Sequence, residues 1–388
     1  MQILPIASGK GGVGKSLLSA NLAIALAQAG NKVVITDLDL GASNIHIMLG
    51  LSGVQQGIGV FLSRSDLKFD DIVLNTGFEN LRFIPGDGEI PGMANLKSWQ
   101  KKKLIKCLLS LDADYIIADC GAGTNFNALD FFLISGTGII VTAPPPTAGL
   151  NAYLFLKNCV FRLMSASFKR GTSARLYFQE MMEKGSDLQR VYLPALFQVI
   201  ADIDPESYSI FQEKLKAFQP SLVLNLLEDP KEAEKADRLR QSCRKYLNVD
   251  MTHLGIIYRD DLQDVALNSR LPIIAYKPGS ILSQSIYRIA DKIMHQDSET
   301  APPLDIDSLN DSYETAKIEA EVDFEIKIRY LEELMNSDEL IPGNLAEAVK
   351  KQQYEIARLR RENNLLKTRL VKAGAAVFKK KPVSGGNT

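Results

Sequence analysis

The 388-residue sequence contains few of the residues that usually build metal sites and disulfide frameworks. Its three histidines stand at positions 46, 253 and 295, and its four cysteines at 107, 120, 159 and 243. The histidines are too dispersed for a cluster, and the cysteines form no C-x-x-C pair. We therefore expect neither a zinc site nor structural disulfides, and the cysteine usage suits a reducing compartment.

Long apolar runs and a net charge are also missing. No apolar run approaches the roughly 20 residues that a membrane-spanning helix needs, and the chain starts with a predicted strand, so no signal peptide is expected. Lys and Arg total 45 against 46 Asp and Glu, so the overall charge favours no class of partner. These absences predict a cytoplasmic protein with at most peripheral membrane contact.

A glycine-rich loop near the amino terminus is the strongest positive signal. Residues 9–16 match the pattern G-x-x-x-x-G-K-[ST], in which backbone N–H groups converge on phosphate oxygens at the start of a helix. The predicted nucleotide-binding residues of this loop are Gly9, Lys10, Gly11, Gly12, Val13, Gly14, Lys15 and Ser16. In this pattern the final lysine meets the β and γ phosphates, and the serine ligates Mg²⁺.

The flanking segments fit a strand, a loop and a helix in that order. Residues 3–7 are apolar, and residues 16–29 are predicted to be helical up to Gly30, a natural stop. Pro5 lacks the N–H that a central strand uses, so we expect a bulge or local distortion there.

The second lysine of the loop, Lys10, has no role in an ordinary phosphate-binding loop. It resembles the signature of the deviant Walker A ATPases, the MinD/ParA family with its flagellar FlhG (FleN)-like branch. The resemblance implies that Lys10 reaches the phosphates of the nucleotide held by a second subunit, so that ATP bridges two copies. An ATP-dependent homodimer that uses ATP and Mg²⁺ is therefore expected.

A second predicted strand, residues 32–36, ends at a pair of aspartates. Asp37 and Asp39 resemble the first switch of the family, and Asn44 matches its switch asparagine. The resemblance implies that Asp37 supports the Mg²⁺ shell and that Asp39 orients the attacking water.

Residues 115–119 form an apolar run that ends in an acid, as expected of a buried parallel strand. Asp119 is the predicted Walker B aspartate, which holds Mg²⁺ together with Ser16. The following residues resemble the second switch, where Gly121 is the candidate sensor of the γ phosphate. No glutamate base stands beside Asp119, and the family resemblance implies slow, partner-stimulated hydrolysis.

Two later strand ends complete the predicted site. Asn225 follows a strand at 221–225 and matches the adenine-recognising asparagine of the family. Another strand is expected to end near Tyr258, where the family usually has proline. Strands that alternate with helices predict an α/β fold, a mostly parallel doubly wound sheet with ligands at the carboxyl ends of the strands.

Three regions follow from the length and composition of the chain. Residues 1–295 are the predicted ATPase domain, residues 296–341 an acidic linker and solvated helix, and residues 342–388 a basic tail. Apolar residues at 349, 356, 359, 366 and 370 give barely three heptads, a short coiled coil. The basic residues of the tail are compatible with three roles: a solvated flank of the coiled coil, a contact with anionic membrane, or a contact with nucleic acid.

A helical insertion is predicted at about 165–220 inside the ATPase domain. Its aromatic residues either pack on the core, the favoured interpretation, or form an exposed partner site. They are Phe168, Tyr177, Phe178, Tyr192, Phe197, Tyr208, Phe211 and Phe218.

The motifs together predict an ATP-dependent dimerising switch that positions a cellular structure such as a flagellum or the division site. ATP closes the dimer, and hydrolysis resets it through an unidentified activating or cargo protein. A ParA-type ATPase that partitions DNA is the first alternative, and an ATP-gated coiled-coil scaffold without hydrolysis is another. Two further classes fit the sequence less well. An iron-sulfur carrier would need paired cysteines, whereas the four cysteines are dispersed. A bacterial tyrosine kinase would need a tyrosine-rich tail, whereas the tyrosines near the end of this chain are scattered.

Overall fold

A mostly parallel sheet organises the part of the chain that the structure describes. The computed structural model describes residues 1–336 except 42, 52–55, 87–95, 184–190 and 296–305. The eight strands of this part are β1 (Gln2–Ser8), β2 (Val33–Leu38), β3 (Leu74–Asn75), β4 (Leu81–Ile84), β5 (Tyr115–Ala122), β6 (Ile139–Thr142), β7 (Ser221–Leu227) and β8 (Thr252–Tyr258). Their order is β3-β4-β2-β5-β1-β6-β7-β8, and only the β3–β4 pair is antiparallel. The predicted doubly wound fold is confirmed.

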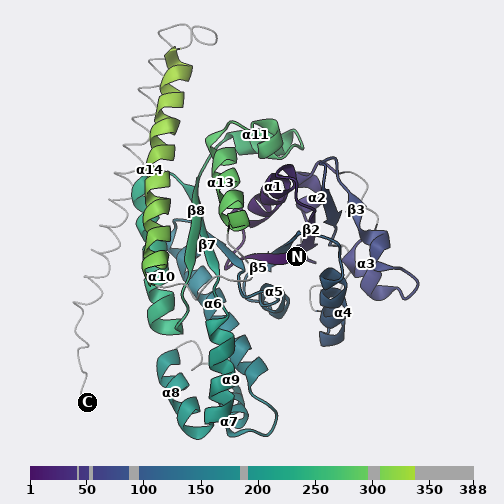
Figure 1. Ribbon diagram of the computed structural model, residues 1–388, viewed down its shortest axis with the longest axis vertical. Coiled ribbons are helices and arrows are strands. Elements are labelled where there is room, and N and C mark those ends of the chain that lie inside the picture. The colour runs from purple at the N-terminus through teal and green to yellow at the C-terminus, as the bar shows by residue number, and fades with distance from the viewer. Residues whose placement is uncertain (42, 52–55, 87–95, 184–190, 296–305, 337–388) are drawn as a thin grey trace, which may run out of the picture. The chain divides into compact units, whose positions relative to one another are not determined.

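Helices cover both faces of this sheet (Figure 1). The first half of the chain contributes α1 (Lys15–Gln28), α2 (Ile45–Met48), α3 (Ile58–Ser63), the 3₁₀ turn η1 (Phe69–Ile72), α4 (Ser98–Leu109), α5 (Phe126–Phe132), α6 (Pro146–Ser167) and α7 (Ser173–Glu183). The second half contributes α8 (Leu193–Ile203), α9 (Pro205–Lys216), the 3₁₀ turn η3 (Pro230–Ala233), α10 (Glu234–Leu247), α11 (Leu262–Asn268), α12 (Ile273–Tyr276), α13 (Ile281–His295) and α14 (Ile306–Asn336). None of these described helices is both long and apolar enough to cross a membrane.

The period-2 alternation of the strands divides the core into two layers. On β1, Leu4 and Ile6 pack with the side chains of α1 and α13, whereas Ile3 and Ala7 pack toward α5 and α6. Pro5 stays in register with Ala118 of β5, and the register shift on this strand lies between Ile6 and Ser8. Pairing with β6 begins only at Ile6. The expected distortion is thus present slightly beyond the proline.

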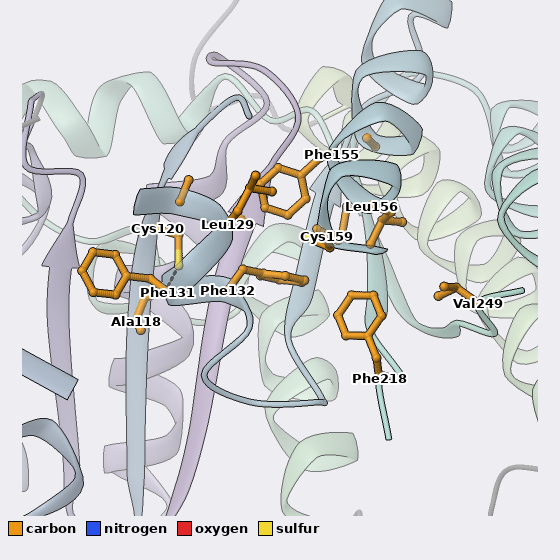
Figure 2. Close-up of a cluster of buried hydrophobic side chains, with 14 of the residues drawn as sticks. Ala118, Cys120, Leu129, Phe131, Phe132, Phe155, Leu156, Cys159, Phe218 and Val249 are labelled. Atoms are coloured by element: carbon orange, nitrogen blue, oxygen red, sulfur yellow. Dashed lines mark hydrogen bonds between the residues drawn. The ribbon is translucent and has the colours of Figure 1, made fainter. Parts of the chain in front are cut away.

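Aromatic packing fixes α5 and α6 against the central strands (Figure 2). The ring of Phe132 on α5 meets Phe155 of α6 edge-on at 5.2 Å, and Phe218 at 6.1 Å. A Cβ at Gly138 would collide with the Phe132 ring, so glycine is required where this ring crosses the start of β6. The amino half of α6 is therefore held closely to the sheet.

The insertion is helical, as predicted, and comprises the end of α6 followed by α7, α8 and α9. Its phenylalanines, Phe168, Phe178, Phe197, Phe211 and Phe218, are all buried in the layer that contains α6. Each contributes on the order of 2 kcal/mol through burial. Tyr208 is partly buried, whereas Tyr177 and Tyr192 are 36% and 53% exposed. The core-packing interpretation thus holds for the phenylalanines.

The chain divides into two compact units, residues 1–324 and residues 325–388. The first part of α14 therefore belongs to the same unit as the sheet, although an acidic, solvated helix was expected here. Tyr313, Ala316 and Ala320 are buried on one face, because they recur at helical spacing between the acids. The Tyr258 hydroxyl donates to the Ala320 carbonyl at 2.8 Å.

Ion pairs reinforce the contact of α14 with α10 and α13. Lys317 lies 2.6 Å from Asp237, and Lys292 lies 2.8 Å from Glu319. The main-chain N–H of His253, on the edge strand β8, donates to the Ser312 hydroxyl at 3.2 Å. An edge strand exposes unpaired backbone groups. Helix α14 therefore provides a hydrogen-bond partner for a backbone N–H of β8 that has no neighbouring strand on that side. The predicted coiled coil and basic tail fall on residues 337–388, outside the described residues.

The ring of His253 is buried, stacks on Tyr313 at 4.9 Å, and has no hydrogen-bond partner for either ring nitrogen within the described structure. Burial lowers the pKa of His253 to about 3, helped by the nearby Lys292 and Lys317. The unfolded chain binds a proton near pH 6.5, whereas the folded chain does not. Stability should therefore fall by up to about 1.4 kcal/mol per pH unit as the pH drops from 6.5 toward 3.

This pH dependence can be measured from urea unfolding at several pH values between 7.5 and 4.5. We expect His253→Phe to flatten the slope, while His295→Phe, at an exposed position on α13, leaves it as in the wild type. Equal slopes in the wild type and His253→Phe would contradict the assignment.

Candidate nucleotide site

The predicted loop lies at the carboxyl end of β1 and leads directly into α1. Gly12 and Gly14 have φ values of 79° and 85°, in the left-handed region where a side chain is unfavourable. Gly14 is the residue that precedes the first turn of α1. The free N–H groups of that turn therefore face the loop, the geometry that binds phosphate at a helix start.

Three side chains from α1 converge on Asp119 of β5. Lys15 Nζ lies 2.8 Å from Asp119 Oδ2, and the Ser16 hydroxyl donates to the same oxygen at 2.7 Å. The Ser19 hydroxyl donates to Asp119 Oδ1 at 2.6 Å. Lys15, Ser19 and Asp119 are all buried. The Walker A and Walker B residues predicted from the sequence thus meet at one point.

Electrostatics keep Lys15 charged. Burial on its own would lower the pKa of Lys15, but the hydrogen bond and charge of Asp119, together with the charges of Asp39 and Asp37, outweigh burial, and the net pKa is raised. The Ser16 hydroxyl and the Asp119 carboxylate supply hard oxygen donors next to the phosphate-binding loop. Mg²⁺ prefers such ligands together with phosphate oxygens, so the residues present fit this ion.

Asp37 lies beside this cluster but faces the first switch. Its Oδ2 accepts hydrogen bonds from the Ser43 hydroxyl at 2.7 Å, the Asn44 N–H at 3.0 Å and the Ile45 N–H at 3.2 Å. Burial and then the Asp119 carboxylate raise the pKa of Asp37. The carboxylate therefore anchors the loop that starts α2, and Asn44 reaches Asp37 through its main chain.

Asp39 and Gly121 face each other across the two switches. A Cβ built on Gly121 would lie 3.4 Å from Asp39 Oδ1, within ordinary van der Waals contact of this carboxylate. Asp39 is only partly buried, unlike Asp37 and Asp119. Asp39 thus combines access to water with proximity to the second switch.

Asn225 is fixed to the phosphate-binding loop itself. Its buried side-chain amide donates to the Val13 carbonyl at 2.9 Å, and its Nδ2 blocks the space that a Cβ on Gly14 would need. The next residue, Leu226, has a φ of 62°, a strained conformation for a leucine. The structure therefore places Asn225 against the phosphate-binding loop, and its predicted recognition of adenine stays a prediction.

Tyr258, at the second of the two later strand ends, has a buried side chain that is directed to Ala320 of α14. The strand end it occupies remains next to the Asn225 region, because the Arg259 N–H donates to the Leu227 carbonyl at 2.9 Å.

The first two residues of the loop contact α6. Lys10 Nζ donates to the Thr147 hydroxyl at 3.4 Å, outside the Asp119 cluster. A Cβ on Gly9 would overlap the main chain of Asn151, so the loop and the helix pack backbone against backbone. The two lysines of the phosphate-binding loop, Lys10 and Lys15, thus lie in different environments.

Sequence reasoning missed two residues of this site, Ser19 and Thr147. Ser19 lies one turn after Lys15 on the same face of α1, a spacing that points both side chains at β5. That spacing was a usable signal. Thr147 follows three consecutive prolines, and nothing in the local sequence indicates contact with Lys10.

Comparison with known proteins agrees with this geometry. Residues 4–366 match the model of the CobQ/CobB/MinD/ParA nucleotide binding domain family. The chain belongs to this family. In the described residues no group of three or more histidines, cysteines or acids could hold a metal ion, and three of the four cysteines are buried.

Individual relatives are more distant. The chain is 31% identical over 159 residues to the antiactivator FleN of Pseudomonas aeruginosa, which covers 40% of this chain and 56% of FleN. It is 35% identical over 162 residues to the flagellum site-determining protein YlxH of Helicobacter pylori, 40% of this chain and 53% of YlxH. The chain thus spans about half the length of these curated relatives.

Among solved structures, the septum site-determining protein MinD from Pyrococcus horikoshii, complexed with Mg-ADP, is similar in fold. The TM-score is 0.53 at 22% identity, covering 77% of this chain and 98% of MinD. The sheet, the phosphate-binding loop and the family match together establish a MinD/ParA-type nucleotide-binding fold.

The packing of Gly9 on α6 gives a test of the site. Gly9→Ala should lower the free energy of unfolding by about 1–3 kcal/mol, because the added methyl overlaps the Asn151 main chain. Gly11→Ala is the matched control, because a Cβ at Gly11 meets no atom within 4 Å. Thermal and urea unfolding of both variants would show the difference. Equal destabilisation would mean that the loop and α6 are not tightly packed.

Proposed function

We propose that this chain is an ATP-hydrolysing switch that positions a cellular structure and closes as a homodimer over ATP and Mg²⁺. The observation that carries the proposal is the separation of the two loop lysines. Lys15 lies with Ser16 at Asp119, whereas Lys10 points away from this cluster toward Thr147. A lysine outside its own phosphate cluster is the arrangement that a contact with a second copy requires.

In this proposal each residue has one role. Lys15 and, from the partner, the second lysine stabilise charge that develops on the phosphates. Ser16 and Asp119 hold Mg²⁺, which neutralises phosphate charge when bound. Asp37 supports this shell from its anchored position, and Asp39 orients the attacking water. Gly121 and Asn44 transmit the nucleotide state to a partner surface, and Asn225 recognises the adenine base.

A pair of variants tests hydrolysis and dimerisation separately. Asp39→Ala should lower the rate of phosphate release by at least about 100-fold, because a positioned base or water-orienting group contributes that much. It should still form the ATP dimer, whereas Lys10→Ala should remain monomeric in ATP and Mg²⁺. Phosphate release and light scattering after gel filtration measure both properties.

Hydrolysis at the wild-type rate in Asp39→Ala would exclude the role given to Asp39. A stable ATP dimer of Lys10→Ala would exclude the bridging role of Lys10. A wild-type protein that binds ATP and never hydrolyses it, even with its cargo present, would favour the scaffold alternative.

The names of the relatives support a flagellar or division-site cargo, since YlxH is a flagellum site-determining protein and MinD is a septum site-determining protein. A ParA-type DNA-partitioning ATPase remains the second candidate, because the family includes ParA and the tail carries clustered lysines and arginines. A peripheral contact of this tail with anionic membrane fits the first candidate.

Co-sedimentation distinguishes the two surfaces. We expect the full chain with ATP and Mg²⁺ to pellet with anionic liposomes, and a chain truncated after residue 341 to stay in the supernatant, because the tail supplies the positive charge. Duplex DNA is the parallel series. ATP-dependent pelleting with DNA and none with liposomes would favour the partitioning function.

A further inference from the structure

Helix α4 divides its lysines between the protein and the solvent. It lies at the periphery of the fold (Figure 1), and it has four lysines, no arginine and no acid. The Lys101 ammonium lies 2.6 Å from the Asp130 carboxylate of α5, and the Lys103 ammonium lies 4.1 Å from the centre of the Phe61 ring. These two lysines hold α4 to its neighbours, so only the other two are left for a further role.

The other two lysines face solvent. Lys102 and Lys106 are exposed, and no described acid lies within ion-pair distance of either. The acids that follow α4 in the sequence are engaged elsewhere, because Asp112 pairs with the Lys32 ammonium at 2.8 Å and Asp114 accepts the Lys32 main-chain N–H at 2.7 Å. Like charges four residues apart on a helix repel each other. The exposed face of α4 therefore carries two positive charges that no ion pair within the described residues neutralises.

Two large apolar side chains lie on the same exposed face. Trp99 is 57% exposed and Leu109 is 52% exposed. With Lys102 and Lys106 they stand at positions i, i+3, i+7 and i+10, a spacing that places four side chains along one face of a helix. The apolar residues are at the two ends of this face, about 15 Å apart along the axis, and the lysines are between them. Leu104 is buried on the opposite side, so the fold presents this face to solvent.

The order of residues along this face favours a lipid surface over a protein partner. Protein interfaces have an apolar centre with a polar rim, and lysine is depleted in them. On α4 the order is reversed, since the charges are central and the apolar side chains are at the ends. Tryptophan is enriched where a membrane meets water, and lysine reaches the headgroups with its ammonium while its stem covers apolar surface.

The same face fits nucleic acid less well. Contacts with duplex DNA are made largely to phosphates, for which arginine offers a bidentate geometry, and α4 has no arginine. Aromatic side chains stack on the bases of single strands. On a duplex, an exposed tryptophan and an exposed leucine would therefore gain little, whereas a bilayer removes both from water.

We propose that the exposed face of α4 is a contact site for an anionic lipid bilayer. Trp99 and Leu109 lie at the level of the headgroups, and the Lys102 and Lys106 ammonium groups lie beside the lipid phosphates. Each lysine at such a surface strengthens binding by about fivefold. The contact is weak by itself and adds to any other anchor of the chain. It requires neither nucleotide nor a second copy, so it does not rest on the proposed ATP switch.

Trp99 is the only tryptophan of the chain, so its fluorescence reports on α4 alone. The full chain, without nucleotide, is titrated with vesicles of equal parts phosphatidylglycerol and phosphatidylcholine. We expect the emission to move to shorter wavelength, because the indole leaves water, and vesicles with brominated acyl chains to quench it on contact. Vesicles of phosphatidylcholine alone should produce neither change, and an equal change with them would overturn the role of the lysines.

Sedimentation of the same samples separates this contact from other anchors. A chain that pellets with the anionic vesicles while its Trp99 emission stays unchanged would overturn the proposal, because binding would then lie elsewhere in the chain. Absence of any binding to these vesicles would overturn it as well. A change in emission that duplex DNA produces and vesicles do not would assign this face to nucleic acid instead.

A charge-matched pair of double variants tests the lysines. Lys102→Gln with Lys106→Gln should weaken binding to the anionic vesicles about 25-fold, since two contacts of about fivefold each are lost. Lys216→Gln with Lys245→Gln removes the same charge from exposed positions on α9 and α10 and should leave binding unchanged. All four side chains are exposed, so the thermal midpoints should match the wild type. Equal weakening by both variants would mean that overall charge, and not α4, draws the chain to lipid.

Discussion

The buried cluster at Asp119 is the interaction on which the site depends. One carboxylate accepts Lys15, Ser16 and Ser19, and it thereby ties the start of α1 to β5. Burying an ion pair costs several kcal/mol per ion in desolvation, and the attraction between the charges repays this only with good geometry and further hydrogen bonds. The two serine hydroxyls supply those bonds. A cluster so costly is better explained by phosphate and metal chemistry than by stability.

The same cluster imposes constraints on its neighbours. Asp37 is aligned with Asp119 across the β2–β5 pair, and two buried carboxylates cannot both stay ionised without compensation. Lys15 and the hydrogen bonds from the 43–45 segment offset this only in part, because burial and the Asp119 carboxylate leave the pKa of Asp37 raised. The segment that starts α2 is therefore held by a carboxylate whose charge is sensitive to Asp119.

Much of the fold could be predicted from the sequence because its signals are local. The apolar strands, the loop glycines and the helix that follows them each occupy a few consecutive residues, and the acids at the strand ends follow from the rule that ligands bind there. The roles of Asp37 and Asp39 near a metal, by contrast, came only from resemblance. The structure shows which carboxylate is anchored by main-chain N–H groups and which faces the second switch.

The contacts that the sequence could not predict join residues far apart in the chain. The contacts of Lys10 with Thr147 and of Gly9 with Asn151 join residues that are separated by about a third of the chain. The first part of α14 was misjudged because its acids suggested a solvated helix, yet Tyr313, Ala316 and Ala320 occupy the face between them. Local composition reports the exposed face of such a helix, whereas the buried face is defined only by the surface it meets.

Tyr258 shows how this distant contact reshapes a strand end. Where relatives of the family are expected to have a proline, this chain has a buried tyrosine whose hydroxyl is satisfied by the Ala320 carbonyl. A buried hydroxyl without a partner would cost about 1–3 kcal/mol, and the bond to the Ala320 carbonyl ties this tyrosine to α14. The same helix partners the edge strand at His253. The carboxyl end of β8 is therefore built partly from a helix that begins nearly fifty residues later in the chain, and the ATPase unit cannot be defined by its nucleotide motifs alone.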